Sequence, residues 1–444
     1  MRLLFGHVIG PPWSAMEEAY AAHFVPASKA RGGLVMRQDG SRLSSLPTSL
    51  AGRTVLQIIP QLDAGGAERT TIDVAAALAE AGARPLVATL GGRLISELQA
   101  NGGVWAPFPA KTKNPLAMAW NVRRLARIIR EEKVDLVHAR SRAPAWVALG
   151  AARLTNTPFV TTYHGSYAGQ SVLKVLYNSV MARGDAVIAN SQFTGDRILR
   201  MHPFAADRIR VIHRGTDFRA FAPEQVDADR VHRLRKSWGL APDDRIVLLA
   251  ARLTGWKGQR VLIEAARLLV AEGLTDTKFV LAGDDQGRDA YVRDLRGRIA
   301  EAGLTGVVRL TGHCADMPAA YLAATVVTVP STEPEAFGRA AVEAQAMGAP
   351  VVVSDLGAVP ETVLAPPQTD PQARTGWRVP PNDPRALADA LAHALSLGET
   401  ARDSLARRAR AHVHSHFSLE RMCAQTLGVY AALIEGSGQG QDNG

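Results

Sequence analysis

The chain has 444 residues, of which 47% are hydrophobic and 21% are charged, with a net charge of +9. This composition is typical of a folded protein of two or three domains and argues against a disordered chain. The two cysteines, Cys314 and Cys423, lie far apart and in no C-x-x-C pattern, which argues against a disulfide scaffold or a zinc site.

The positive charge is spread unevenly. Residues 53–220 hold 22 Lys and Arg against 12 Asp and Glu, whereas residues 221–444 hold 24 against 27. The excess predicts an acidic partner for the first half: an anionic lipid, an acidic saccharide or nucleic acid. No apolar run reaches about 18 residues, so we expect no membrane-spanning helix.

Residues 1–52 are expected to form an N-terminal extension that is partly disordered. Their apolar pattern is broken and ends in RQDGSRLSSLPTSLAG, a composition typical of loops. The apolar start is followed at once by PPW, which argues against a signal peptide. Met36 is an alternative start that the sequence does not decide.

From residue 53 onward, short β-branched runs alternate with helical patterns. The strand-like runs of the first half are TVLQIIP, RPLVATL, VDLVHAR, PFVTTYHG, AVIANS and IRVIHRG. The rhythm restarts after Phe221 with IVLLAAR, KFVLAG, VVRLTG, VVTVPS, PVVVSD and GWRVP. Such alternation predicts parallel sheets, here in two doubly wound, Rossmann-like α/β domains at 53–220 and 221–417 that face each other across a cleft. Ligands of such sheets bind at the carboxyl ends of the strands.

One helix of the first half, in residues 114–133, has a basic face. A helical wheel gathers Trp120, Arg123, Arg127 and Arg130 on one side. The roughly opposite side carries Met118, Val122, Leu125 and Ile129 and would pack on the sheet. The basic side suits contact with an anionic lipid surface, although an ordinary solvated face explains it equally well.

Two cations follow the first strand of the second half, in AARLTGWKGQ. Arg252 stands at the strand end and Lys257 at a helix start. A guanidinium and an ammonium in this position suit a diphosphate. A solvated arginine and a surface lysine remain the alternative.

The stretch STEPEAFGRAAVEAQAMGAP, residues 331–350, places two carboxylates at the start of a helix. Prolines 330 and 334 disfavour a helix before Glu335, so we expect it to begin near Phe337-Gly338, with Glu343 about two turns inside. The first amides of a helix bind anions, and Gly338 allows a close approach. Glu335 is therefore a candidate for a sugar and Glu343 for a ribose, because carboxylates accept hydrogen bonds from hydroxyls.

The chain ends in HFSLERMCAQTLGVYAALI, which predicts a helix at 418–435 capped by Ser418 and followed by a frayed tail.

Together these motifs resemble a known enzyme family. The sequence from Ala251 to Gly258 nearly matches G-R-L-x-x-x-K-G, and Glu335 and Glu343 match E-x7-E. With Gly65-Gly66-Ala67-Glu68 and His164-Gly165 upstream, residues 53–435 look like a family 4 retaining glycosyltransferase of the GT-B fold, of the bacterial cell-surface polysaccharide or lipopolysaccharide type. The resemblance also implies that the C-terminal helix crosses back to the first domain.

The resemblance implies roles for the matching residues. Arg252 and Lys257 would neutralise the diphosphate, while Glu335 would bind the donor sugar and Glu343 the ribose. Further contacts would come from the backbone at Phe337, Gly338 and Arg339, from His164 across the cleft, from His313 beside the nucleobase and from the closing loop at Gly65 and Gly66. The two cations would replace a metal, so no cofactor is expected. Arg214, in HRGTD, and Glu333 receive no role.

The sequence therefore predicts a cytoplasmic glycosyltransferase that moves a hexose-type unit from a nucleotide sugar to a saccharide or lipid-linked acceptor. It would serve cell-envelope polysaccharide or glycolipid synthesis and contact the inner face of the membrane through the basic helix. A nucleotide-sugar epimerase of the same fold is the alternative enzyme. A nucleic-acid-binding protein is the alternative from another class, but the interleaved aromatics of single-strand binders are missing. No strand is followed by G-x-G-x-x-G, which disfavours a Rossmann dehydrogenase.

Overall fold

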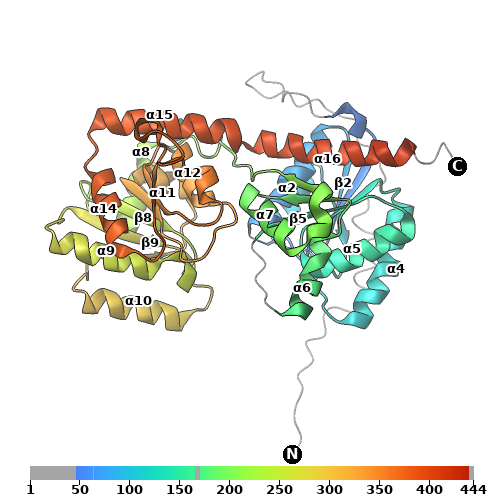
Figure 1. Cartoon of the computed structure of the whole chain (residues 1–444), viewed down its shortest axis with the longest axis horizontal. Coiled ribbons are helices and arrows are strands. Elements are labelled where there is room, and N and C mark those ends of the chain that lie inside the picture. Colours follow the sequence, from blue (N-terminus) through green and yellow to red (C-terminus); the bar gives the residue numbers. More distant parts are fainter. Residues whose placement is uncertain (1–46, 64, 166–170, 440–444) are drawn as a thin grey trace, which may run out of the picture.

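The computed structural model describes residues 47–63, 65–165 and 171–439. Most of the predicted N-terminal extension, including Met36, lies outside these residues. The described chain forms two α/β domains side by side, joined along one edge by two long helices (Figure 1). This arrangement confirms the prediction of two doubly wound domains.

The first domain is built on a seven-stranded sheet in the order β3-β2-β1-β4-β5-β6-β7, in which all neighbours are parallel. Most of its strands are buried along their whole length, as expected where helices cover both faces. The strands are β1 (Thr54–Ile58), β2 (Arg84–Thr89), β3 (Val104–Pro107), β4 (Leu136–Ala139), β5 (Phe159–Tyr163), β6 (Ala186–Ala189) and β7 (Ile209–Val211).

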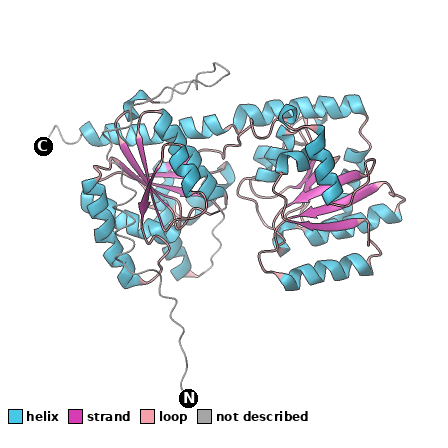
Figure 2. Cartoon of the chain, turned by 180° about the vertical axis from the view of Figure 1, so that it is seen from behind, coloured by secondary structure: helices cyan, strands magenta, loops and turns pink. Residues whose placement is uncertain are grey.

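Helices cover both faces of this sheet (Figure 2). They are α2 (Gly66–Glu80), α3 (Ile95–Ala100), α4 (Pro115–Glu131), α5 (Arg142–Thr155), α6 (Val172–Asn178) and α7 (Gln192–Met201), with the 3-10 turns η2 (Thr48–Leu50), η3 (Ser179–Ala182) and η4 (Pro203–Arg208). Leu50, placed by the sequence in the extension, is fully buried in the core of this domain. No helix in the described part of the chain is long and apolar enough to cross a bilayer.

The second domain has a six-stranded sheet in the order β10-β9-β8-β11-β12-β13, again with parallel neighbours. Its strands are β8 (Arg245–Ala250), β9 (Thr277–Ala282), β10 (Val308–Gly312), β11 (Val326–Val329), β12 (Val351–Ser354) and β13 (Trp377–Val379). Its helices are α8 (Ala228–Ser237), α9 (Gln259–Ala271), α10 (Asp289–Glu301), α11 (Met317–Ala323), α12 (Arg339–Ala346), α13 (Val359–Thr362), α14 (Pro384–Leu395) and α15 (Glu399–His416), with the turns η5 (Pro223–Gln225), η6 (Gly255–Lys257) and η7 (Pro371–Ala373).

The last helix, α16 (Leu419–Gln439), crosses back from the second domain and packs against α2 of the first (Figure 1). Ser418 caps it, since its hydroxyl accepts a hydrogen bond of 3.1 Å from the amide of Arg421. The fully buried Tyr430 bonds His138 of β4 at 2.5 Å, which anchors the helix in the first core. The predicted crossing is confirmed, and the helix extends four residues beyond the predicted end at 435.

Candidate active site

A cleft of about 730 Å³ opens between the carboxyl ends of the two sheets. Residues of both domains line it, from the ends of strands β5 and β6 on one side and of β8, β9 and β11 on the other. The rule that ligands bind outside the carboxyl ends of parallel strands predicts a binding site at this place.

The second domain contributes two cations to the cleft. Arg252 follows β8 and is exposed, and Lys257 closes the turn η6. Gly258 then adopts a φ of +77°, and a side chain there would collide with the carbonyl of Pro330 at the end of β11. The glycine therefore allows the lysine-bearing turn to approach the loop that carries the first glutamate of the E-x7-E motif.

That glutamate, Glu335, is 8% exposed and lies in a loop after β11. Its carboxylate accepts hydrogen bonds of 2.5 Å from Lys257 Nζ and 2.6 Å from Ser331 Oγ. Gly338 takes a φ of +89° and caps α12, so that the chain from Glu335 to the helix start lines the cleft. The helix thus begins at Arg339, within two residues of the predicted start.

The second glutamate, Glu343, is buried in α12 with 5% of its surface exposed. It is the fifth residue of the helix, a little more than one turn inside rather than the predicted two. Its carboxylate binds Tyr321 OH at 3.1 Å and Arg339 at 2.7 Å. The negative charge of Glu343 raises the pKa of Arg339. Arg339 thus adds a charged side chain to the lining of the cleft.

The first domain forms the opposite wall with His164, which directly follows β5. Both ring nitrogens are buried and have no hydrogen-bond partner among the residues that the structure describes. Burial, together with the charges of Arg214 and Arg140, lowers the pKa of His164 well below its usual value. The neutral imidazole can therefore offer one donor and one acceptor to a ligand hydroxyl.

Arg214, which received no role from the sequence, also lies in this wall. Its guanidinium rests against Gly66, where any side chain would collide with it. Burial and the charges of Arg339 and Arg140 lower the pKa of Arg214 to about 10, so it remains charged at neutral pH. Asp73 of α2 interacts electrostatically with Arg140 and Arg339, which lower its pKa, but burial has the larger effect and raises the pKa to about 6.

The structure brings most of the predicted donor-site residues into one cleft. Its lining includes His164, Arg252, Lys257, His313, Glu335, Phe337, Gly338, Arg339 and Glu343. Gly65 precedes α2 as its cap residue and Gly66 begins the helix; neither belongs to the lining, although Gly66 lies against Arg214. Asn190, Asp284 and Tyr321 line the cleft but were missed by the sequence interpretation. The first two closely follow β6 and β9, so the strand-end rule could have identified them.

The predicted basic face of α4 is exposed and separate from the cleft. Arg123, Arg127 and Arg130 line a shallow groove of about 500 Å³ together with Leu154 at the end of α5. Trp120, on the same helix, is 63% exposed. The opposite side, including Leu125 and Ile129, is buried in the core as predicted.

No group of three or more His, Cys, Asp or Glu residues suited to hold a metal ion occurs within the described ranges.

Two family models match the two domains in turn. Residues 64–219 match the model described as Glycosyltransferase Family 4, and residues 231–412 match the model described as Glycosyl transferases group 1. The first match covers strands β2 to β7, and the second covers β8 to β13.

Related proteins point to the same family. The chain is 30% identical over 406 residues to a D-inositol 3-phosphate glycosyltransferase of Xylanimonas cellulosilytica, covering 83% of this chain and 92% of the relative. Among solved structures, a glycosyltransferase from Rickettsia africae superposes with a TM-score of 0.78 at 32% identity, covering 86% of this chain and 99% of the other. Anabaena HepE, solved with UDP and glucose, gives a TM-score of 0.73 at 25% identity over 86% and 100% of the two chains. The chain therefore belongs to the family 4 glycosyltransferases and has the GT-B fold.

Proposed function

We propose that the enzyme transfers a hexose-type sugar, with retention of configuration, from a nucleoside diphosphate sugar to a saccharide or lipid-linked acceptor. The observation that carries this proposal is the pair of Lys257, in the turn η6, and Glu335, in the loop before α12, in the cleft that His164 lines from the other domain. A cation for the leaving diphosphate and a carboxylate for the sugar hydroxyls are thus held within 2.5 Å of each other.

In this proposal the donor binds mainly to the second domain. Arg252, Lys257 and the amides at the start of α12 hold the diphosphate, because they supply fixed positive charge where negative charge develops. Glu335 accepts hydrogen bonds from the donor sugar and Glu343 from the ribose. His313 lies beside the nucleobase, and His164 contacts the sugar from the first domain. No metal is required, since the two cations stabilise the leaving group.

The acceptor hydroxyl attacks the anomeric carbon from the side on which the diphosphate leaves. The bond from that carbon to the phosphate oxygen breaks as the new glycosidic bond forms, and the departing phosphate takes the hydroxyl proton. Such a reaction depends on stabilisation of the leaving group more than on a protein base.

The test is a panel of nucleotide sugars. The correct donor should raise the melting temperature of the enzyme most, because a ligand that binds only the folded chain stabilises it. Incubation with that donor and candidate saccharide or glycolipid acceptors should then give a product whose anomeric configuration matches the donor by NMR. Interconversion of the free nucleotide sugar without any transfer would favour an epimerase instead.

The names of the relatives favour a second acceptor class, a small phosphorylated polyol such as D-inositol 3-phosphate. Support comes from the basic wall of the first domain, where Arg214 lines the cleft and Arg140 is buried nearby. Including D-inositol 3-phosphate among the acceptors decides between the classes, because transfer of any sugar to it would exclude an exclusively lipid-linked acceptor.

We further propose that the enzyme is cytoplasmic and works at the inner face of the membrane, in cell-envelope polysaccharide, lipopolysaccharide or glycolipid synthesis. Support comes from α4, whose exposed Leu116 and Trp120 stand on the same helix as the three arginines of the basic groove. Apolar and basic groups together suit an anionic bilayer surface. Reversing the charges of Arg123, Arg127 and Arg130 should abolish sedimentation with phosphatidylglycerol vesicles and leave transfer to a water-soluble acceptor unchanged. Persistent sedimentation would contradict a membrane role for α4.

A further inference from the structure

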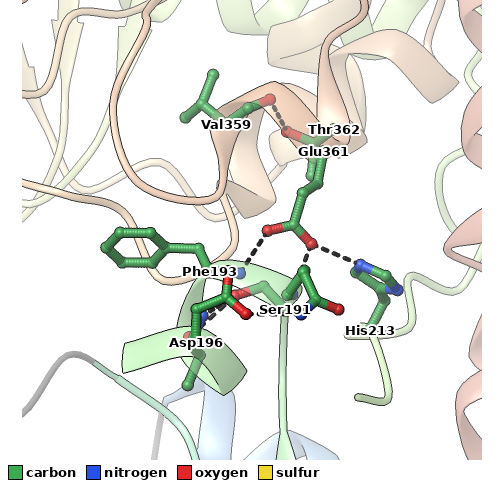
Figure 3. Close-up of polar contacts among 9 residues, drawn as sticks. Ser191, Phe193, Asp196, His213, Val359, Glu361 and Thr362 are labelled. Atoms are coloured by element: carbon green, nitrogen blue, oxygen red, sulfur yellow. Dashed lines mark hydrogen bonds and ion pairs between the residues drawn. The ribbon is translucent and has the colours of Figure 1, made fainter. Parts of the chain in front are cut away.

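A glutamate of the second domain, outside the E-x7-E motif, reaches across to the first domain. Glu361 belongs to α13, and its carboxylate accepts hydrogen bonds from the backbone amides of Gln192 and Phe193 at 2.7 and 2.8 Å (Figure 3). It also binds Nε2 of His213 at 2.8 Å. We call this set of three contacts the interdomain latch.

Within the latch, Glu361 of the second domain accepts hydrogen bonds from the first two backbone amides of α7, a helix of the first domain. The first amides of a helix have no partner within the helix, and its dipole favours a negative charge there. Ser191 accepts a bond from the next amide, that of Thr194, at 3.1 Å. Burial alone would raise the pKa of Glu361, but the bonds from His213, Phe193 and Gln192 outweigh burial and lower it. The carboxylate is therefore charged at neutral pH.

On the second domain, the latch is connected to the loop of Glu335. The amide of Ala358, three residues before Glu361, donates to the carbonyl of Glu335 at 2.9 Å. The adjacent Gly357 has a φ of +71°, and a side chain there would collide with the same carbonyl. Thr362, which follows Glu361, accepts a bond of 2.9 Å from Gln345 of α12. These contacts fix α13 to the Glu335 loop and to α12 within the second domain.

On the first domain, each partner of Glu361 is a close neighbour in sequence of a residue that lines the cleft. Asn190 stands two residues before Gln192, and Arg214 directly follows His213. The His213 ring also packs 6.4 Å from the ring of Phe337, centroid to centroid, and Phe337 lies between Glu335 and α12. The latch thus joins the two walls of the cleft through short and rigid connections.

We propose that Glu361 is a positioning residue for sugar transfer, which holds the His164 wall of the first domain against the Glu335 loop of the second. The proposal rests on the function proposed above. The residues assigned to the nucleoside diphosphate all belong to the second domain, so its binding should not need the latch. Transfer requires groups from both domains at one sugar, so transfer should depend on the latch.

The test compares Glu361→Gln, which keeps the size of the side chain and removes its charge, with Glu301→Gln. Glu301 is an exposed glutamate at the end of α10 in the same domain and serves as the matched control. We expect the radius of gyration from small-angle X-ray scattering to increase for Glu361→Gln alone. The affinity for UDP, measured by calorimetry, should stay within about twofold. The kcat of transfer should fall about tenfold or more, because hydrogen bonds to a charged carboxylate stabilise the arrangement in which both domains contact the sugar.

Two further variants separate positioning from general damage. Glu361→Asp keeps the charge and should recover part of kcat and the compact scattering profile. His213→Gln should lower kcat as well, and its effect should not add to that of Glu361→Gln, since the two residues share one contact.

The proposal is overturned if Glu361→Gln matches the wild type in both scattering and kcat. It is also overturned if UDP affinity and melting temperature fall together with kcat, because the carboxylate would then support the second domain rather than the domain arrangement. If the wild-type enzyme binds neither UDP nor any other nucleoside diphosphate and transfers no sugar, the proposed function fails. The scattering comparison of the two glutamine variants still decides whether the latch holds the domains.

Discussion

Replacing Lys257 by alanine should affect stability and donor binding through two separable causes. Its Nζ lies 2.5 Å from Glu335, which at an effective dielectric constant of about 20 is a gross attraction of about 7 kcal/mol. Most of this offsets desolvation, and loss of one partner of a buried pair costs about 3–5 kcal/mol net. The two side chains are 17% and 11% exposed, so we expect a loss of about 3 kcal/mol, near the lower limit of that range.

In the proposed donor complex, the same substitution removes a cation from the diphosphate. One charged hydrogen bond contributes about 1.5–3 kcal/mol, so the affinity for the nucleoside diphosphate should fall about 10- to 150-fold. The double variant Lys257→Ala/Glu335→Gln distinguishes the causes. It no longer buries an uncompensated carboxylate and should regain most of the stability, but it should still bind the diphosphate weakly.

Urea unfolding followed by circular dichroism measures the first effect, and calorimetry with the best nucleoside diphosphate measures the second. Lys278→Ala is the control, because its Nζ lies 3.9 Å from Asp244 and such a long pair contributes less than about 1 kcal/mol. Wild-type diphosphate affinity in the double variant would refute the phosphate role of Lys257. Wild-type stability in the single variant would refute the calculation for the pair.

Three other predictions concern single residues. Glu335→Gln should lower kcat of transfer about 100-fold or more with an unchanged circular dichroism spectrum, and near-normal turnover would remove Glu335 from the site. Tyr430→Phe should cost about 1–3 kcal/mol in urea unfolding, because buried His138 loses its 2.5 Å partner, and an unchanged midpoint would contradict the anchoring of α16. Folding raises the pKa of Asp73 from 3.8 to about 6, so the folded protein binds this proton more tightly than the unfolded protein. The wild type should therefore lose stability as the pH rises from about 4 to 6. Asp73→Asn should flatten that part of the melting-temperature profile, and an equally steep profile would exclude Asp73 as its source.

The secondary structure was largely readable from the sequence, because buried parallel strands are continuous β-branched runs. The missed strand, β3, has the sequence VWAP and forms one edge of the first sheet. A four-residue edge strand with a proline and a half-buried tryptophan has neither the apolar run nor the alternation on which strand prediction depends.

The donor side of the site was also predictable, since Lys257, Glu335 and Glu343 stand in local motifs with fixed spacing. The places of Arg214 and Glu361 could not be predicted from the sequence. The place of Arg214 depends on its contact with Gly66, about 150 residues away in the chain, and that of Glu361 on how the two domains meet. Contacts between separately folded units leave no local pattern, so only the three-dimensional arrangement reveals them.

The crossing of α16 has a consequence for the order in which the protein can be completed during synthesis. The first sheet leaves the ribosome early, yet part of its core is supplied by Leu427 and Tyr430 near the end of the chain. About 200 residues of the second domain must be translated in between, which takes about 10–40 s at 5–20 residues per second. During that interval the nascent first domain exposes the apolar groove that α16 will fill. A chain truncated before residue 419 should therefore leave the second domain intact and make the first one aggregate.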